Sequence, residues 1–422
     1  MKKFQAYFDH ASTTPLHKKV FDKMTPYFLE DYGNASNLYE SGRVARQAVS
    51  GALLEISKAL GCRADEFVFT GSATESDNLA ILGAARANKS THNRIIISAL
   101  EHKGVMAVGE ALEKEGFEII KIGVGADSLV DIEELKRNLN EKTAIVSITM
   151  ADSETGTLQP IAEISKIIKD FRKDKSLPYF HTDASQASVY GDIDVGKLGV
   201  DMMTMSAHKL HGPKGIGGLF VKKGIRLTPL IYGGGHQGKL RSGTENVPAI
   251  VGFGEAVRLN EIHKKKDSKK IARLRDMLEK GIIRSIPKVI VNGNPKYRLP
   301  NFTNISILDI EGESLLLELD EHGIMINTGS ACNSESLEPS YVLSAMGNPY
   351  EFVHGSIRFT LGPESNERQV KHVLKHLPKI VERLRRISPL NLNEGEKKVM
   401  SDPRAFIGGQ TPHFLRKKRK LG

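Results

Sequence analysis

The sequence predicts an α/β fold built on a mostly parallel sheet, because short apolar runs alternate with amphipathic helical stretches over most of its length. The pattern is typical of a doubly wound sheet. The strand-like runs lie at residues 67–70, 94–98, 117–122, 144–150, 179–181, 202–205 and 218–221.

Residues 36–61 carry a clear helical pattern ahead of the first of these strands. Gly61 follows the pattern as a stop signal. We interpret this helix as scaffold. Its apolar side chains recur at helical spacing at Val44, Ala48, Leu53, Ile56 and Leu60.

Length and composition set the outer limits of the fold. With 422 residues, 40% of them hydrophobic, the chain can bury a large core and form two domains. No apolar run approaches the roughly 18 residues that a membrane span requires, and residues 1–10 lack the apolar core of a signal peptide. We therefore expect a cytoplasmic enzyme without membrane contact.

The chain has only two cysteines, Cys62 and Cys332, which lie far apart and have no metal ligands at close spacing. This usage supports neither a disulfide framework nor a metal site. Cys62 follows Gly61 at the end of the predicted helix, so we expect a half-buried, unreactive side chain there.

Half of the formal charge of +10 comes from residues 391–422. Residues 391–422 carry eight Lys or Arg against three Asp or Glu, with the densest run at residues 416–420. A solvated basic tail is the favoured interpretation. Weak contact with nucleic acid or with an acidic partner is the alternative.

Lys209 lies where the strand-like run at residues 202–205 gives way to a glycine-rich stretch. In α/β sheets the carboxyl ends of the strands present ligand-binding groups. Gly212, Gly215 and Gly217 would let the backbone turn close to whatever Lys209 contacts. Most single lysines are solvated, so this position alone does not make Lys209 a nucleophile.

Residues 67–76 predict a strand, a tight turn at Gly71 and the start of a helix near Thr74. The free N–H groups and the positive end of the helix dipole favour a phosphate there. The spacing matches neither the Rossmann fingerprint nor the P-loop. Phosphate binding and an ordinary helix cap are equally compatible with this motif.

Polar side chains follow several of the predicted strands, and their chemical properties complement one another. A lysine can form a Schiff base, a carboxylate can keep a pyridine nitrogen protonated, and an imidazole can stack on a ring. Hydroxyl groups beside a helix start can hold a phosphate. Pyridoxal phosphate uses all of these groups, and the candidates are Thr74, His102, Asp183, Gln186, Ser206, His208 and Lys209.

Over about residues 4–388 the sequence resembles the class V family of pyridoxal-phosphate enzymes, and within it the NifS/IscS-type cysteine desulfurases. The most specific motif is Gly329-Ser330-Ala331-Cys332-Asn333-Ser334. The other motifs that carry the resemblance lie at residues 8–15, 73–78, 101–102, 181–187, 206–209, 241–246, 337–340 and 356–359.

The resemblance implies a role for each cofactor-binding residue. Lys209 would hold pyridoxal 5'-phosphate as a Schiff base and later act as a base at the substrate α-carbon. Asp183 would pair with the pyridine nitrogen, Gln186 would contact the phenolic oxygen, and His102 would stack on the ring and relay protons. The remaining implied cofactor contacts are Ala73, Thr74, Ser206 and His208, the last three at the phosphate.

The resemblance also implies a homodimer, because Thr244 matches the residue that reaches the phosphate of the partner subunit. Arg358 would hold the substrate carboxylate through a two-pronged contact. Asn34 matches a position near that carboxylate.

Cys332 would be the catalytic thiolate that takes the sulfur of L-cysteine as a persulfide and leaves alanine. The long interval from Cys332 to Arg358 resembles the group that hands its persulfide directly to an acceptor protein. That acceptor would be an iron-sulfur scaffold or a tRNA-thiolation protein.

Some positions depart from the family pattern. Asp152 and Ser153 stand where the family usually has two asparagines, Gly71-Ser72 reverses the common order, and His236-Gln237 replaces the usual Gln-Glu. These changes concern substrate preference and efficiency more than the cofactor.

The resemblance implies pyridoxal-phosphate fold type I, with a large domain at residues 15–260 holding a mostly parallel seven-stranded sheet. A smaller α/β domain would combine residues 1–14 with 261–390 and carry the Cys332 loop, and residues 391–422 would form the basic tail. Two alternatives to a cysteine desulfurase stay open. One is a selenocysteine lyase or another class V enzyme, and the other is a binding or scaffold protein that retains the cofactor.

Overall fold

The computed structural model describes residues 4–329 and 339–387, and its largest sheet has seven strands. All neighbouring strands run parallel except β8, which is antiparallel to both of its neighbours. The predicted mostly parallel α/β fold is therefore confirmed. In spatial order the strands are β2 (Phe67–Thr70), β8 (Gly217–Val221), β7 (Met202–Ser206), β6 (Tyr179–Asp183), β5 (Thr143–Ser147), β3 (Arg94–Ser98) and β4 (Glu118–Ile122).

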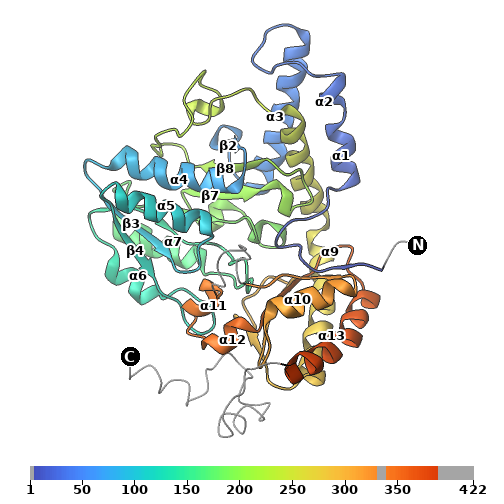
Figure 1. Ribbon diagram of the computed structural model, residues 1–422. Coiled ribbons are helices and arrows are strands. Elements are labelled where there is room, and N and C mark those ends of the chain that lie inside the picture. The colour runs from blue at the N-terminus through green and yellow to red at the C-terminus, as the bar shows by residue number, and fades with distance from the viewer. Residues whose placement is uncertain (1–3, 330–338, 388–422) are drawn as a thin grey trace.

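Helices cover both faces of this sheet (Figure 1). Successive side chains of a strand point to opposite faces, so Phe67 and Phe69 join one core while Val68 joins the other. One face packs on α4 (Ala73–Asn88) and α5 (Lys103–Lys114). The other face packs on α3 (Glu40–Leu60), α6 (Ile132–Asn138), α7 (Ile161–Arg172), α8 (Val195–Leu198) and the first half of α9 (Val247–Ser285).

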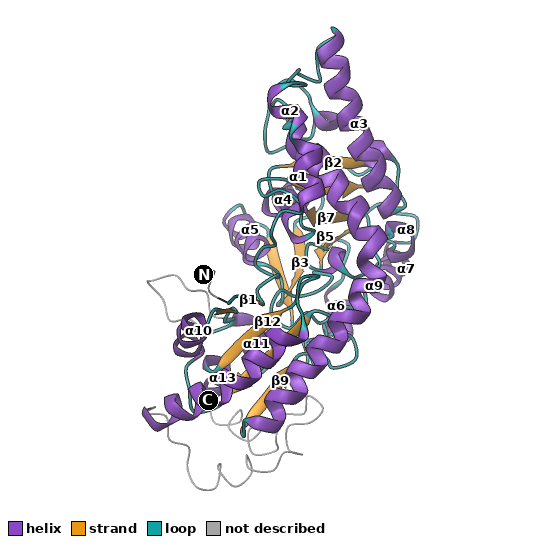
Figure 2. Ribbon diagram, turned by 90° about the vertical axis from the view of Figure 1, so that its right-hand side faces the viewer, coloured by secondary structure: helices purple, strands orange, loops and turns teal. Residues whose placement is uncertain are grey.

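The predicted scaffold helix is α3, and it ends as expected at Gly61, whose φ of 65° is left-handed. It lies along α9 at close range. A Cβ on Gly254 of α9 would come within 2.6 Å of the Cα atom of Ala52, so only glycine permits this approach. Two short helices, α1 (Lys18–Met24) and α2 (Pro26–Leu29), precede α3 and extend beyond the sheet with it (Figure 2).

A second, antiparallel sheet forms a separate core. It contains β12 (Ser356–Thr360), β10 (Phe302–Ile307) and β9 (Val289–Asn292) in that order. Its apolar side chains pack with α10 (Gly312–Glu321), α13 (Glu367–Ile387) and the second half of α9. Beside it β1 (Ala6–Tyr7) pairs in parallel with β11 (Ile324–Met325). Two short helices, α11 (Tyr341–Ala345) and α12 (Tyr350–His354), lead into β12.

The 39-residue helix α9 joins the two cores. The charged stretch at residues 263–270 lies in the middle of this helix. The predicted division at residue 260 therefore falls inside a continuous helix, and not in a loop.

None of the described helices is long and apolar enough to cross a membrane. Cys332, the motif at residues 329–334 beyond Gly329, and the basic tail at residues 391–422 lie outside the described residues.

Candidate active site

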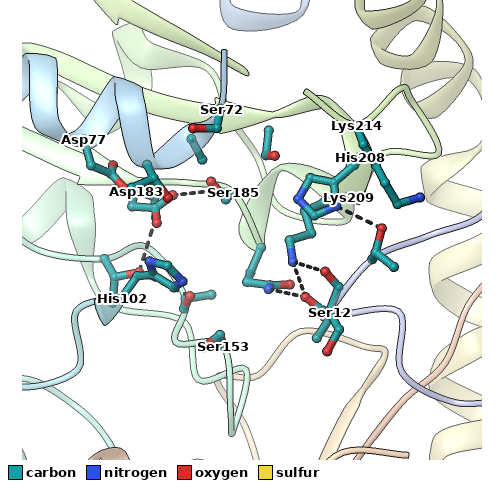
Figure 3. Close-up of a pocket in the computed structure, with 18 of the residues that line it drawn as sticks. Ser12, Ser72, Asp77, His102, Ser153, Asp183, Ser185, His208, Lys209 and Lys214 are labelled. Atoms are coloured by element: carbon teal, nitrogen blue, oxygen red, sulfur yellow. Dashed lines mark hydrogen bonds between the residues drawn. The ribbon is translucent and has the colours of Figure 1, made fainter. Parts of the chain in front are cut away.

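A cavity of about 640 Å³ opens at the edge of the large sheet where β3, β6 and β7 end (Figure 3). Asp183 is the last residue of β6, Ser206 is the last residue of β7, and His102 caps the start of α5 after β3. Since the carboxyl ends of parallel strands meet at one edge, residues far apart in sequence line one space. The predicted residues that line it are Ala73, Thr74, His102, Asp183, Gln186, Ser206, His208, Lys209 and Arg358.

Lys209 ends a short 3₁₀ turn, and its amine is held by the N-terminal segment of the chain. Its Nζ donates to the carbonyl oxygen of Ala11 and, at 2.7 Å, to that of Ser12. Burial lowers the pKa of Lys209 to about 8, and the nearby Arg358 guanidinium adds to this effect. The amine is therefore neutral far more often at neutral pH than an ordinary lysine, as nucleophilic chemistry requires.

Asp183, Gln186 and His102 are fixed by backbone contacts. Asp183 accepts a hydrogen bond from the backbone N–H of Ser185 at 2.8 Å, and Gln186 donates to the Ala11 carbonyl at 2.9 Å. The His102 ring accepts through Nδ1 from the Gly104 N–H at 3.0 Å. Its neutral form therefore carries the proton on Nε2.

Hydroxyl and imidazole groups surround the start of α4 at another side of the cavity. Ser72 caps the helix by accepting from the Glu75 N–H at 3.1 Å, and Thr74 follows in the first turn. A Cβ on Gly217 would lie 2.5 Å from the carbonyl carbon of Ser72, so glycine lets this helix start approach β8. His208 contacts the Thr13 hydroxyl through Nδ1 at 3.0 Å. Such a helix start with free N–H groups suits a phosphate.

Arg358 projects from β12 of the second sheet into the same cavity, and its side chain is only 8% exposed. Its guanidinium donates to the Ser153 carbonyl at 2.6 Å, to Asp9 at 2.7 Å and to the Ser12 hydroxyl at 2.9 Å. Its buried Nε has no hydrogen-bond partner among residues 4–329 and 339–387. An unpaired buried donor is costly.

Asp152 shows what one departure from the family pattern does. Its buried carboxylate accepts from the backbone N–H groups of Glu154 at 2.9 Å, Thr155 at 2.6 Å and Thr157 at 3.1 Å, so it organises the turn at residues 152–157. The neighbouring Ser153 lines the cavity. The change from asparagine at position 152 is thus matched by a structural role.

Gln237, which also departs from the family pattern, links the segment that precedes α9 to β2. Its side chain accepts from the Phe69 N–H at 2.9 Å and donates to Glu245 at 2.5 Å.

Ala11, Ser12, Thr13 and Asp77 were not among the predicted site residues. The first three carry the carbonyl and hydroxyl groups that hold Lys209 and His208. Asp77 lines the cavity from α4, and burial raises its pKa well above the usual range, with the nearby carboxylate of Asp183 adding to the shift. The motifs at residues 8–15 and 73–78, already noted for the resemblance, were the signals that could have found them.

Two predicted residues do not line this cavity. Thr244 is exposed in the segment before α9, and Asn34 lies between α2 and α3, where its side chain accepts from the Ser36 N–H at 2.9 Å.

The donor set fits pyridoxal phosphate: an amine for its aldehyde, a carboxylate for its pyridine nitrogen, an imidazole beside the ring and a helix start for its phosphate. The fold and the cavity thus define an enzyme of pyridoxal-phosphate fold type I. The chain belongs to the aminotransferase class-V family, whose model matches residues 6–373.

The chain is similar to two curated proteins that are both named cysteine desulfurase IscS. The first, from Dictyoglomus turgidum, is 44% identical over 387 residues, which cover 92% of this chain and 97% of the relative. The second, from Methanosarcina thermophila, is 44% identical over 388 residues, covering 92% of this chain and 95% of the relative. Among solved structures, a NifS-like protein superposes with a TM-score of 0.85 at 32% identity, covering 90% of this chain and 100% of that one.

Proposed function

We propose that the chain is a cysteine desulfurase that takes sulfur from L-cysteine and leaves L-alanine. The observation that carries the proposal is the buried amine of Lys209, which lies in one cavity with Asp183, His102 and Arg358. The names of its relatives, at 44% identity over almost their whole length, supply the substrate.

Different residues of the cavity would hold different parts of the cofactor. When bound, pyridoxal phosphate withdraws electrons from the bonds at the substrate α-carbon. Lys209 would hold its aldehyde carbon, Asp183 its pyridine nitrogen and Gln186 its phenolic oxygen, with His102 against the ring. The residues proposed for the phosphate end are Ala73, Thr74, Ser206 and His208, together with Thr244 of a second subunit.

Lys209 is also the proposed base at the α-carbon, because its pKa of about 8 lets it accept and return a proton near neutral pH. Arg358 would hold the substrate carboxylate, with Asn34 as a weaker candidate nearby. Cys332 would form a sulfur–sulfur bond with the substrate sulfur while the carbon–sulfur bond breaks, so that the protein keeps a persulfide.

The purified protein loaded with cofactor is the material for the test of this function. L-cysteine and a reducing thiol should yield alanine and sulfide in equal amounts. No alanine from L-cysteine, with turnover of another amino acid instead, would overturn the proposal.

Arg358→Lys is expected to weaken substrate binding, because lysine cannot offer two parallel N–H donors to a carboxylate. Loss of one charge-assisted hydrogen bond corresponds to a fall in kcat/KM of about 10- to 100-fold, carried mainly by KM. Steady-state kinetics with L-cysteine measures this, and the cofactor absorbance band should remain. Arg258→Lys, on the surface beside Glu255, is the matched control. An unchanged KM in Arg358→Lys would remove Arg358 from the substrate site.

A homodimer is proposed from the large exposed apolar side chains on α1, α2, α3 and the loop between α2 and α3. Contiguous exposed apolar patches on soluble chains mark interaction sites. Thr244 and Asn34, which do not line the cavity of their own chain, would then act across the interface. The large exposed side chains of this surface are Phe21, Phe28, Leu29, Tyr32, Leu38, Tyr39 and Leu54.

Charge placed on this surface should separate the subunits. Leu29 and Leu38 are 82% and 80% exposed, so Leu29→Glu combined with Leu38→Glu should leave the single chain folded. Light scattering after gel filtration should show a dimer for the native chain and a monomer for the variant. Leu317→Glu, 67% exposed on α10, should remain dimeric, and an unaltered mass of the double variant would contradict the assignment.

We also propose the two-domain division at residues 15–260 and at 1–14 with 261–390, supported by the two sheets with their separate apolar cores. The sulfur acceptor, the contacts of the tail at residues 391–422 and the cytoplasmic location stay predictions.

A further inference from the structure

Outside the cavity, three side chains of metal-binding type converge from separate parts of the chain. His10 follows β1, His211 lies two residues after Lys209, and Glu364 follows β12. One ligand atom from each lies within 4.8 Å of the others. Two imidazoles and one carboxylate are a ligand set found in three-residue zinc sites, with water as the fourth ligand.

His10 is buried and already oriented for such a role. Its Nδ1 donates to the Thr360 carbonyl at 3.0 Å, so the lone pair is on Nε2, which lies 3.6 Å from Glu364 Oε2. Metal-binding histidines are commonly oriented by such a bond to a backbone carbonyl. A Cβ on Gly362 would lie 2.0 Å from this Nε2. Glycine at position 362 therefore leaves room for the His10 ring.

His211 is fixed through its backbone. It is a non-glycine residue with a φ of 59°, a conformation held here because its N–H donates to the Thr14 hydroxyl and its carbonyl accepts from the His17 N–H, both at 3.0 Å. Its Nδ1 lies 4.0 Å from Glu364 Oε1 and 3.1 Å from the Pro15 carbonyl. On metal binding this nitrogen would exchange the carbonyl contact for the ion.

Of the three side chains, Glu364 can move most easily, because it is 59% exposed to solvent. Ligand atoms bonded to zinc at about 2.0–2.1 Å in a tetrahedron lie about 3.3 Å apart. In the structure Glu364 Oε2 lies 3.6 Å from His10 Nε2, and Glu364 Oε1 lies 4.0 Å from His211 Nδ1. A shared ion would therefore need the carboxylate to move and the three ligand atoms, now within 4.8 Å of one another, to draw together.

We propose that His10, His211 and Glu364 form a binding site for a divalent transition-metal ion of the Zn²⁺ type. Imidazole nitrogens favour such ions, whereas Mg²⁺ and Ca²⁺ prefer all-oxygen ligands. The site is separate from the cofactor cavity and does not depend on the proposed function.

An ion bound at this site would contact three separate parts of the chain. His10 precedes Ala11 and Ser12, whose carbonyls accept from Lys209, and His211 lies on the turn that follows that lysine. Glu364 lies in the turn that follows β12, the strand that carries Arg358. A bound ion would therefore link the N-terminal segment, the Lys209 turn and the second sheet, and stabilise the folded chain by mass action.

The test uses full-length protein loaded with cofactor and carrying two background changes. Cys332→Ser removes a competing thiol, and His376→Asn breaks up a surface stack of histidines in which its ring lies 4.2 Å from His322 and 4.5 Å from His372. Co²⁺ is titrated by its visible ligand-field absorption and then displaced with Zn²⁺, and Tm is recorded with and without Zn²⁺. One Co²⁺ per chain and a Zn²⁺-dependent rise in Tm are expected.

Glu364→Gln should weaken Co²⁺ binding at least about tenfold and abolish the rise in Tm. Glu367→Gln, a surface change beside Arg273, is the matched control and should bind Co²⁺ normally. His10→Asn gives the same expectation from a buried ligand, and Glu364→Gln keeps the test valid if that variant does not fold. Equal Co²⁺ affinity in Glu364→Gln, or no saturable binding, would overturn the site and leave only a His10–Glu364 ion pair.

Discussion

Lys209→Ala is expected to abolish desulfuration of L-cysteine, with a loss in kcat/KM of at least about a thousandfold. Lys214 also lines the cavity but is exposed, whereas the buried Lys209 amine, with its lowered pKa, is the one suited to bond with the cofactor aldehyde and then move a proton at the substrate α-carbon. The absorbance band of lysine-bound cofactor should vanish, and borohydride should no longer fix the cofactor to the chain. Alanine formation and the visible spectrum measure both effects.

The pKa of Lys209 adds a second readout to the same experiment. Only the neutral amine reacts with an aldehyde, so the rate at which cofactor-free protein takes up pyridoxal phosphate should rise with pH and level off above the pKa of about 8. An ordinary lysine would not level off until about pH 10.4. Lys223→Ala, an exposed lysine after β8, is the control. Full turnover in Lys209→Ala would refute the assignment.

The strand-end residues could be predicted because their signal is local. A buried apolar strand followed at once by a polar side chain places that side chain at the sheet edge, as with Asp183 after β6 and Ser206 before Lys209. Parallel topology then brings such positions together without any knowledge of side-chain contacts. Predicted strand bounds were within a few residues of the structure: the run expected to reach Met150 ends at Ser147, although the Ile148 N–H still donates to His181.

The contacts made by the N-terminal segment could not be predicted in the same way. Ala11 and Ser12 act through backbone carbonyls, which leave no side-chain signal, and they meet Lys209 only because the chain crosses from the small sheet to the large one. His10, His211 and Glu364 are likewise separated by about 200 and 150 residues. Contacts between residues so far apart in the sequence leave no periodic pattern from which they could be predicted. The Nε of Arg358, which is unpaired among the residues that the structure describes, also emerges only from the packed structure.

Cys332→Ser is expected to separate sulfur transfer from cofactor binding. A serine hydroxyl cannot form the sulfur–sulfur bond that releases alanine, so alanine formation should fall by at least about a hundredfold while the cofactor band persists. Native protein given L-cysteine without a reducing thiol should carry one extra sulfur atom on the peptide that contains Cys332, as mass spectrometry would show. The variant should carry none.

Cys62→Ser is the matched control, because the chain offers a second cysteine with the opposite properties. Burial raises the pKa of the Cys62 thiol to about 12, and the nearby carboxylate of Glu66 adds to the shift. At neutral pH this cysteine is almost never a thiolate, and it lies at the end of α3, whereas the residues lining the cavity come from other elements. Its replacement should therefore leave alanine formation unchanged. Undiminished alanine release in Cys332→Ser, or loss of it in Cys62→Ser, would mean that sulfur leaves the substrate by a route that does not use Cys332.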